Sequence, residues 1–548
     1  MASPLARGSR GPATFASVLL VAGILSSCAA GPEPPDASDR PNLVFVLADD
    51  LDRETMDHLP RLRAMLDGAG TSFSNAFVSD SLCCPSRSTI LRGQYPHSTG
   101  IFTNLPPDGG FSRFHDLGRE DSTIATWLHD AGYRTALLGK YLNGYPDAAV
   151  GRAYVPKGWD VWASPVAGNP YGEYDYTLNQ SGALVRYGHA EDDYLVDVLA
   201  DGAERVIRDD VLPDGRRKQP LFLYVAPFKP HEPANPAPRY AGAFADQTAP
   251  RVPSFDEPDV SDKPAYVRQP RLTPAAVTAI DALYRRRLAS MLAVEDLVAR
   301  IIAALAATGE LERTYLFFSS DNGFHLGQHR LLPGKQTAYD EDIRVPLVVR
   351  GPGVPAGRML DHLVQNADLA PTFAALAGIA PPYPTDGRSL APLLDRSPPP
   401  ASAWRQALLV EHVGAAGALT GPAAGPLASA AARLGLATRR PAAPRGTPLE
   451  PPDALDQGGA PLEPPDPLDQ SGASRAIPTY QAIRTATHLY VEYATGEREL
   501  YDVTRDPYEL ASLHASEPAL AARLAAALAR LRTCAGDACR AAEDLAAP

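Results

Sequence analysis

The run PNLVFVLADD, residues 41–50, indicates the fold class of this 548-residue chain. Its apolar stretch is rich in β-branched and aromatic side chains, which predicts a buried strand. Two acidic residues, Asp49 and Asp50, follow that strand at once. A buried strand that leads directly into carboxylates is a candidate for the edge of a sheet at which ligands bind.

Strand-like runs of the same kind recur along the chain, separated by segments in which apolar residues have helical spacing. Strands that alternate with long helices predict an α/β sheet with helices on both faces. The other strand-like runs are residues 221–226, 314–319, 345–350 and the hairpin 482–493, followed by turns around 501–507. The helical segments are residues 58–67, 121–128 (with Asp121 as N-cap), 193–207, 273–308 and 519–531.

Polar side chains follow three of these strands. Asp49 and Asp50 follow the first, Asp321 and Asn322 follow the strand at 314–319, and a histidine lies a few residues after the strand at 221–226. Carboxylate and amide oxygens suit Ca²⁺ or Mg²⁺ better than zinc. Either acidic pair alone would indicate only a polar loop or a turn. Their shared position at strand ends favours a metal site.

The sequence SLCCPSRSTILRG, residues 81–93, contains a cysteine followed at fixed offsets by a proline and an arginine. This pattern resembles the motif by which sulfatases mark a cysteine for oxidation to formylglycine, an aldehyde. A leucine and a glycine also stand where that motif has them. The matching positions are Cys83, Pro85, Arg87, Leu91 and Gly93. The occurrence of this motif together with the two acidic strand ends argues against a chance match.

The chain is similar to sulfatases of the alkaline phosphatase-like superfamily, and within it to N-acetylglucosamine-6-sulfatases and heparan endosulfatases. The similarity begins at about Pro41 and continues to the C-terminus, except for one insertion. It implies an α/β/α sandwich with a central, mostly parallel sheet and a smaller C-terminal α+β subdomain. The segments that carry it are residues 82–87, 139–143, 174–178, 320–325, 342–347 and 534–539.

The resemblance implies a mechanism. Formylglycine at residue 83 would be hydrated, attack sulfur to form a covalent sulfo-enzyme, and then expel sulfate. A divalent ion, Ca²⁺ with Mg²⁺ as the alternative, would lower the pKa of the attacking hydroxyl and screen the sulfate charge. The metal ligands implied are Asp49, Asp50, Cys83 (as formylglycine), Asp321 and Asn322.

The resemblance also implies catalytic roles for charged side chains that would, in isolation, be assigned to solvated surfaces. Arg87 would hold the hydrated aldehyde in place. Lys140 and Lys335 would donate charge-assisted hydrogen bonds to it or to sulfate oxygens. His231 would protonate or otherwise assist the leaving oxygen.

One position departs from the pattern of many sulfatases. These have a histidine two residues after the lysine that matches Lys140, where the present chain has Leu142. The glucosamine-6-sulfatase pattern also has leucine there, so the departure indicates the subfamily. It leaves the base for sulfate elimination unassigned. His325, close in sequence to the metal ligands, is our hypothesis for that base.

The N-terminus predicts a targeting segment. Basic residues precede an apolar run that is too short for a comfortable membrane span. The run leads to Leu-Ser-Ser-Cys, which resembles a bacterial lipobox with Cys28 as the lipidated residue. The alternative is an ordinary signal peptide cut nearby. We predict a lipoprotein-type signal peptide over 1–28, a tether over 29–40, and an exported chain that is lipid-anchored to the bacterial cell envelope or otherwise secreted.

The remaining chain divides by composition. Residues 41–404 are predicted to form the catalytic domain and residues 405–548 the C-terminal subdomain. From about 413 to 476, Ala, Gly and Pro dominate and the hexapeptide PLEPPD occurs twice. Such a segment cannot bury a core and is predicted to be a disordered surface insertion.

Cysteine positions and net charge add two expectations. Cys534 and Cys539 lie close together near the end of an exported chain, which favours a small-loop disulfide. Adjacent cysteines bridge only with strain, so Cys84 is predicted to be a free, buried thiol. The formal net charge of −13 argues against nucleic acid as a partner.

Three functions compete. The first is a sulfatase acting on a sugar sulfate such as a 6-sulfated N-acetylglucosamine unit, with a formylglycine-generating enzyme as its maturation partner. The second is a phosphodiesterase or phosphonate monoester hydrolase of the same superfamily. The third is an inactive envelope lipoprotein that binds sulfated glycans. The segments around Tyr174 and Asp342 favour the sulfatase, and the intact Cys-x-Pro-x-Arg argues against a binding module.

Overall fold

The computed structural model of the chain describes residues 40–209, 217–414 and 477–545. The predicted signal peptide, most of the tether and Cys28 lie outside these residues, as does the predicted insertion from residue 415 onward. No helix in the described part of the chain combines the length and the apolar character needed to cross a membrane.

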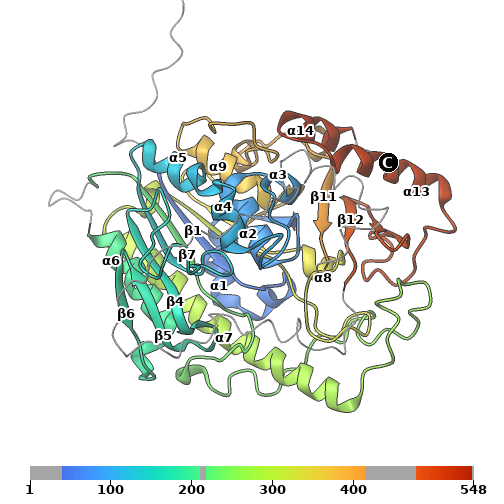
Figure 1. Ribbon diagram of the computed structural model, residues 1–548, viewed down its shortest axis with the longest axis horizontal. Coiled ribbons are helices and arrows are strands. Elements are labelled where there is room, and N and C mark those ends of the chain that lie inside the picture. The colour runs from blue at the N-terminus through green and yellow to red at the C-terminus, as the bar shows by residue number, and fades with distance from the viewer. Residues whose placement is uncertain (1–39, 210–216, 415–476, 546–548) are drawn as a thin grey trace, which may run out of the picture. The chain divides into compact units, whose positions relative to one another are not determined.

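Ten strands form one sheet (Figure 1). In spatial order they are β10 (Arg358–Gln365), β2 (Thr71–Phe77), β9 (Leu347–Arg350), β8 (Thr314–Ser320), β1 (Asn42–Ala48), β7 (Leu221–Ala226), β3 (Arg134–Gly139), β4 (Val161–Asn169), β5 (Tyr174–Gln180) and β6 (Ala183–Arg186). The five strands from β8 to β4 are parallel to their neighbours in that block. β9 is antiparallel to β8 and β2, and β4, β5 and β6 pair antiparallel at one edge.

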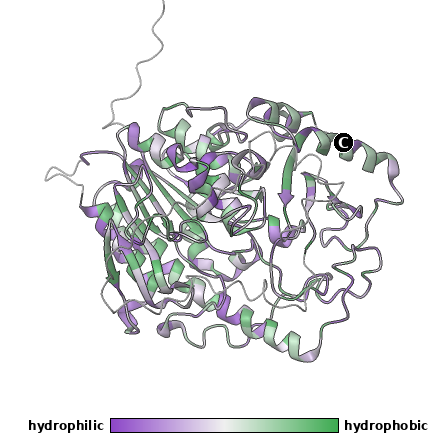
Figure 2. Ribbon diagram, viewed as in Figure 1, coloured by the Kyte–Doolittle hydropathy of each residue, from purple (hydrophilic) through white to green (hydrophobic). Residues whose placement is uncertain are grey.

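The central strand β1 is buried along its whole length because both faces of the sheet are covered. Leu43, Phe45 and Leu47 belong to one apolar core, and the alternate residues Val44 and Val46 belong to a second core. Side chains of a strand alternate between faces, so a strand between two helix layers needs apolar residues at every position. This accounts for the uninterrupted apolar run in the sequence, which Figure 2 shows as hydrophobic strands.

Helices form a layer on each face of the sheet, which confirms the predicted α/β/α sandwich. One layer is built from α2 (Cys83–Arg92), α4 (Gly110–Asp116), α5 (Ile124–Asp130), α9 (Leu369–Leu376) and α10 (Ala391–Leu394). The other is built from α1 (Pro60–Met65), α6 (Leu195–Arg208) and the long α7 (Pro274–Ala307). Two short helices, α3 (Pro96–Thr99) and α8 (Asp340–Ile343), lie toward the C-terminal part of the chain (Figure 1).

A second, antiparallel sheet follows, with the order β11 (Ala407–His412), β12 (Tyr480–Thr485), β13 (His488–Tyr493) and β14 (Arg498–Asp502). The helix α13 (Pro518–Leu531) packs Leu524 and Leu528 against it, and α14 (Asp537–Asp544) contacts β11. This confirms the smaller α+β part, whose first strand starts close to the predicted boundary at 404/405. That boundary itself stays a prediction.

Several local expectations need correction. Thr123, not Asp121, is the N-cap of α5, and its backbone N–H donates to Thr126 Oγ1 at 2.9 Å. The strand predicted from 345 begins at Leu347, after Pro346, which has no N–H for a sheet hydrogen bond. Tyr501, predicted in a turn, lies in the edge strand β14.

The cysteine expectations are confirmed. Cys534 and Cys539 form a disulfide across a separation of five residues. Cys84 is fully buried and forms no disulfide, and the same is true of Cys83 beside it.

Candidate active site

Four adjacent parallel strands bring the predicted site residues to one edge of the sheet. Asp49 follows β1, and Asp321 follows β8, whose last residue pairs in register with Ala48. Lys140 follows β3, and His231 lies five residues beyond β7. Because β8, β1, β7 and β3 are neighbours, their carboxyl ends place these four side chains around one point.

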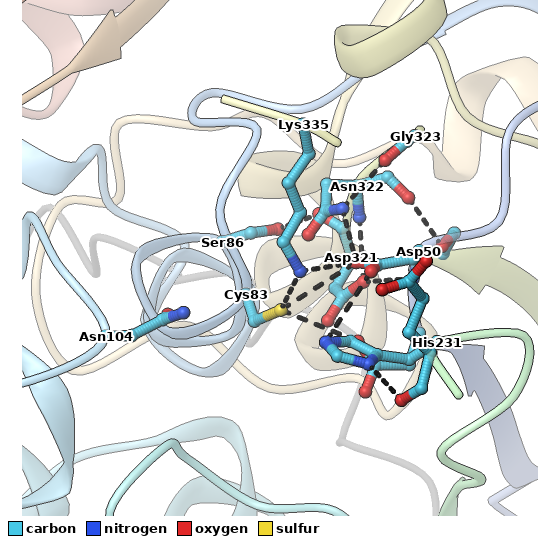
Figure 3. A network of polar contacts seen from close by, with 12 residues as sticks. Asp50, Cys83, Ser86, Asn104, His231, Asp321, Asn322, Gly323 and Lys335 are labelled. Atoms are coloured by element: carbon cyan, nitrogen blue, oxygen red, sulfur yellow. Dashed lines mark hydrogen bonds and ion pairs between the residues drawn. The ribbon is translucent and has the colours of Figure 1, made fainter. Parts of the chain in front are cut away.

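Cys83 reaches the same point from α2, where it is the first helical residue. Its Sγ lies 3.5 Å from Asp49 Oδ1 and 3.9 Å from Asp50 Oδ1. Lys335 Nζ donates to this sulfur at 3.0 Å (Figure 3). The candidate nucleophile is therefore surrounded by two carboxylates and a cation.

Each of the three carboxylates of the site forms its shortest ion pair with a different buried cation. Lys140 Nζ lies 2.7 Å from Asp49 Oδ2, and Lys335 Nζ lies 2.7 Å from Asp50 Oδ1. Arg87 Nε lies 2.8 Å from Asp321 Oδ2. A second Arg87 nitrogen donates to the Lys140 carbonyl at 3.1 Å. Pairing of this kind offsets the free-energy cost of burying six charges.

The pairing shifts the pKa values of the acidic side chains. Burial alone would raise the pKa of Asp49, but the charges of Lys140, His231 and Arg87 lower it to about 2. At Asp50, burial would again raise the pKa, but the charges of Lys335 and His231 lower it below its ordinary value. Both carboxylates are therefore ionised at neutral pH.

The cations and the thiol shift in the opposite direction. Burial would lower the pKa of Lys140, but Asp49 raises it above the ordinary value. Asp321 and Asp49 overcome the same burial effect at Arg87 and raise its pKa. Burial raises the pKa of the Cys83 thiol well above 9.0 despite the two nearby lysines. An unmodified Cys83 is thus held as a thiol, which is a poor nucleophile.

The backbone at Asp50 has a left-handed conformation, with φ of 66°. Its N–H donates to Asp321 Oδ1 at 3.1 Å, and its carbonyl accepts from Arg287 at 2.5 Å. Arg287 is fully buried on α7. These bonds hold in place a conformation that a non-glycine residue adopts only at a cost, and they fix the direction of the Asp50 side chain.

Asn322 provides the test of whether the residues fit a metal ion. Its Nδ2 donates to Asp50 Oδ1 at 2.7 Å, while its Oδ1 is buried and has no hydrogen-bond partner. A buried carbonyl oxygen without a donor beside ionised carboxylates fits a hard cation such as Ca²⁺ or Mg²⁺. Asp321, one of the expected metal ligands, uses both its oxygens for other contacts. Its Oδ2 accepts from Arg87, and its Oδ1 accepts from backbone N–H groups.

His231 approaches the same carboxylates. Its Nε2 lies 3.6 Å from Asp50 Oδ2, and its Nδ1 lies 2.8 Å from the carbonyl of Glu232. One ligand atom each from His231, Cys83, Asp49 and Asp50 lies within 4.8 Å of the others. The ring is partly exposed, so it is the side chain of this group best placed to meet a substrate from solvent.

Sequence reasoning missed a supporting aromatic side chain. The ring of Tyr171 lies 4.6 Å from that of His231, and Lys140 Nζ lies 5.2 Å from the Tyr171 ring centroid. A buried pair, Lys229 and Glu173 at 3.1 Å, holds the segment just before His231. Only the nearby marker at residues 174–178 could have drawn attention to this region.

His325 is not among the residues that the structure brings together around Cys83. Its Nδ1 lies 3.0 Å from each carboxylate oxygen of Asp342, and its backbone pairs with Gly334. Gly334 precedes Lys335, so His325 adjoins the loop that carries that lysine. Leu142 is buried and lines a pocket beside Lys140, together with Tyr145 and Tyr171 among others.

Comparisons with known proteins agree with this geometry. The sulfatase family profile matches residues 41–379. The N-acetylglucosamine-6-sulfatase of Capra hircus is 33% identical over 519 residues, which are 92% of this chain and 85% of the relative.

Solved structures share the fold. A protein solved in complex with its substrate D-glucosamine-2-N,6-O-disulfate has a TM-score of 0.65 and 20% identity, with coverage of 92% of this chain and 99% of the other. The phosphonate monoester hydrolase of Agrobacterium radiobacter has a TM-score of 0.58 and 20% identity, covering 90% and 95%. The predicted alkaline phosphatase-like fold is therefore confirmed. On the profile match and the extent of the sequence identity, this chain belongs to the sulfatase family, whose members are sulfuric ester hydrolases.

Proposed function

We propose that the chain hydrolyses a sulfate ester of a sugar, and that a 6-sulfated N-acetylglucosamine unit is its substrate. The support for the sugar is the similarity to N-acetylglucosamine-6-sulfatases over nearly the whole chain. The fold shared with a protein solved with a 6-O-sulfated glucosamine is compatible with it.

The observation that carries the proposal is the charge balance around Cys83. Three carboxylates and three cations pair one to one, so their charges cancel. A divalent cation would therefore leave the site positive, which suits an ester with a single negative charge, such as a sulfate ester. Asp49, Asp50, Asn322 and, after reorientation of its carboxylate, Asp321 would hold Ca²⁺ or Mg²⁺, which would polarise sulfate oxygens and activate the nucleophile.

We further propose that residue 83 of the working enzyme is formylglycine, whose hydrated aldehyde supplies the nucleophile. The position at the start of α2, 3.5 Å from Asp49 and 3.0 Å from Lys335, suits an oxygen that must be held and deprotonated. A formylglycine-generating enzyme would then be the maturation partner, and the oxidation would precede folding because Cys83 is fully buried.

The surrounding side chains would divide the remaining work. Arg87 would orient residue 83 through the carboxylates of Asp321 and Asp49. Lys140 and Lys335 would donate to sulfate oxygens as charge-assisted donors. His231, the most exposed of the group, would protonate the leaving sugar oxygen. His325, oriented by Asp342, lies outside the group around Cys83, so its proposed role as the base for sulfate elimination requires proton transfer through an intervening water.

Peptide mass spectrometry across residues 81–93, on protein from its native host, tests the modification. We expect conversion of Cys83 to formylglycine and an unmodified Cys84. Unmodified Cys83 in active protein would contradict the formylglycine mechanism.

Parallel turnover assays test the substrate class. N-acetylglucosamine-6-sulfate, an aryl sulfate and an aryl phosphonate monoester are offered to the same preparation. We expect the sugar sulfate to give the highest kcat/KM. A preference for the phosphonate would assign the chain to the second candidate function, and sulfated-glycan binding without turnover of any ester would assign it to the third.

We also propose that the protein is exported and anchored to the cell envelope through a lipid on Cys28. The support is the lipobox-like sequence that ends at this residue. Mass spectrometry of the mature N-terminus should find an acylated Cys28, and Cys28→Ala should release the protein from the membrane fraction. A mature N-terminus downstream of Cys28 would support ordinary secretion instead.

A further inference from the structure

A second cluster of potential metal ligands lies outside the site around Cys83. It consists of His329, Glu341 and Glu509, and one ligand atom from each lies within 4.8 Å of the others. His329 and Glu509 are fully buried and Glu341 is half-buried. We propose that these three side chains bind a second divalent cation, a transition metal of the Zn²⁺ type, which joins the Lys335 loop to the C-terminal sheet.

The imidazole of His329 is held as a metal-binding histidine requires. Its Nδ1 lies 2.7 Å from Glu257 Oε2, and its Nε2 is buried with no hydrogen-bond partner. A histidine that binds a metal usually donates its other N–H to a carboxylate, which fixes the tautomer and leaves a lone pair for the ion. Lys263 Nζ lies 3.4 Å from Glu257 Oε1 and so helps to hold that carboxylate in place.

Each carboxylate of the cluster is also anchored through one oxygen. Glu509 Oε2 accepts from the backbone N–H of Asp340 at 3.2 Å, while its Oε1 is buried with no partner. Glu341 Oε1 accepts from Ser254 Oγ at 3.3 Å. Two unpartnered buried atoms, His329 Nε2 and Glu509 Oε1, thus belong to side chains that converge on one point, where a ligand can satisfy both.

The nearby lysine and arginine side chains are paired with other carboxylates than those of the cluster. Asp340 is paired with Arg484 at 2.9 Å, and Glu257 is paired with Lys263. In the described part of the chain neither Glu341 nor Glu509 forms an ion pair with a lysine or arginine. One divalent cation would balance both carboxylates.

The donor set selects the class of metal. One imidazole nitrogen and two carboxylates suit Zn²⁺ and similar first-row dications, whereas Ca²⁺ and Mg²⁺ take oxygen ligands. The buried, unpartnered Nε2 of His329 supplies the nitrogen ligand of this set. The ligands of this cluster therefore differ in kind from the oxygen-rich set around Asp50.

The position of the cluster indicates what the cation would do. His329 lies in the loop that leads to Lys335, Glu341 lies in α8, and Glu509 follows β14. α8 adjoins β12, because Asp340 pairs with Arg484 of that strand (Figure 1). A cation that bridges these segments would stabilise the loop carrying Lys335, since a site formed only in the folded state couples binding to folding.

Zinc stoichiometry and thermal unfolding of the full-length protein test the proposal. Chelator-treated wild type, Glu509→Gln and the control Glu312→Gln, which alters an exposed glutamate, are titrated with Zn²⁺ alone. The metal that remains after gel filtration is then measured. We expect wild type and Glu312→Gln to retain one more Zn²⁺ per chain than Glu509→Gln, and only these two to gain thermal stability. The aspartates around Cys83 are intact in all three proteins, so the difference reports the second cluster and not the proposed active-site metal.

Co²⁺ absorption provides a second readout that does not depend on Glu509→Gln. We expect a d–d spectrum whose midpoint in the titration shifts at least tenfold to higher Co²⁺ in Glu257→Gln, because loss of the supporting carboxylate weakens the histidine ligand. Equal Zn²⁺ retention in all three proteins, or a Co²⁺ titration unchanged by Glu257→Gln, would overturn the proposal.

Discussion

At the scale of single residues, the site around Cys83 is built from charges that are matched one to one. Arg87 and Asp321 are both fully buried, and removal of one partner from such a pair leaves an uncompensated buried charge. In variants of Arg87, Lys140 or Lys335, a loss of activity therefore does not distinguish a catalytic defect from a folding defect. His231 is the exception, because its ring is partly exposed and its acidic neighbour Asp50 is also paired with Lys335.

We predict that His231→Asn lowers kcat by roughly 100- to 10,000-fold with little change in Tm, because it removes a proton donor for the leaving oxygen. The loss should be smaller for aryl sulfates with acidic leaving groups, which need less protonation. Steady-state kinetics over a series of aryl sulfates measures this dependence. Tyr171→Phe, which keeps the ring beside His231, is the control. An equal loss for all leaving groups would contradict the assigned role.

For His325 we predict that substitution by Ala slows sulfate elimination more than the first cleavage. The alcohol product should then appear in a burst of one equivalent, followed by a slow steady state, in stopped-flow measurements with an aryl sulfate. His325→Ala with unchanged turnover would rule out the assignment, and the base would have to be sought elsewhere.

At the scale of elements, α2 combines chemistry and packing in one motif. Cys83 and Arg87 are four residues apart, so they lie on the same face of the helix and both reach the strand ends. Pro85 is tolerated in the first turn, where its missing N–H would have no helical partner. Leu91 is buried in the core, and Gly93 ends the helix with φ of 66°. The motif therefore also specifies where the helix starts and stops.

We predict that Gly93→Ala destabilises the fold by about 1–2 kcal/mol from the left-handed conformation alone. A Cβ there would also lie 3.0 Å from Pro371 Cδ and from Thr385 Cγ2, which adds a steric cost. Urea unfolding measures the difference. Gly309→Ala is the matched control, because Gly309 has φ of 75° and a Cβ on it would meet nothing within 4 Å. Equal destabilisation of the two variants would contradict the steric contribution.

At the scale of the whole molecule, buried ion pairs join the large sheet to the C-terminal part. Arg405 contacts Asp368 at 2.6 Å and Glu543 of α14 at 2.8 Å, and all three side chains are fully buried. His97 Nδ1 lies 2.8 Å from Glu411 of β11, and its Nε2 lies 2.9 Å from the carbonyl of Cys534. The disulfide-bonded end of the chain is thus held against the helix layer that contains α2.

This junction predicts a pH dependence of stability. Burial opposes protonation of His97, but Glu411 and then Asp386 raise its pKa from 6.5 to about 9. A raised folded-state pKa stabilises the fold fully below pH 6.5, and that contribution is lost as the pH rises through 9. We expect the free energy of unfolding to fall by about 3 kcal/mol across this window.

Denaturant titrations between about pH 6 and pH 10 measure the effect. His97→Gln is the control, because it cannot titrate and retains every other ionisable group, so the difference between the two curves isolates this residue. A pH profile of wild type parallel to that of His97→Gln would show that the junction does not couple to pH.

Much of the fold and of the candidate site could be predicted from the sequence. The apolar run before Asp49 predicted a buried strand, and the Cys-x-Pro-x-Arg pattern pointed to Cys83, but the helix α2 that begins at Cys83 was not predicted. Local patterns could not reveal that β9 is antiparallel, since its direction depends on how the chain returns between β8 and β2. Nor could they identify Tyr171, whose role comes from packing against His231.

The sequence by itself determined the α/β class, the strand ends that carry the acidic residues, and the residue proposed for modification. The first two follow from periodicity along the chain, and the third follows from the resemblance of the Cys-x-Pro-x-Arg pattern to the sulfatase motif. Only the tertiary structure decided which cation neutralises which carboxylate, and that His329, Glu341 and Glu509 converge. Such pairings join atoms far apart in the chain, as in Lys335 and Asp50, which are separated by 285 positions. Energies of buried charges depend on these distances, and no local pattern encodes them.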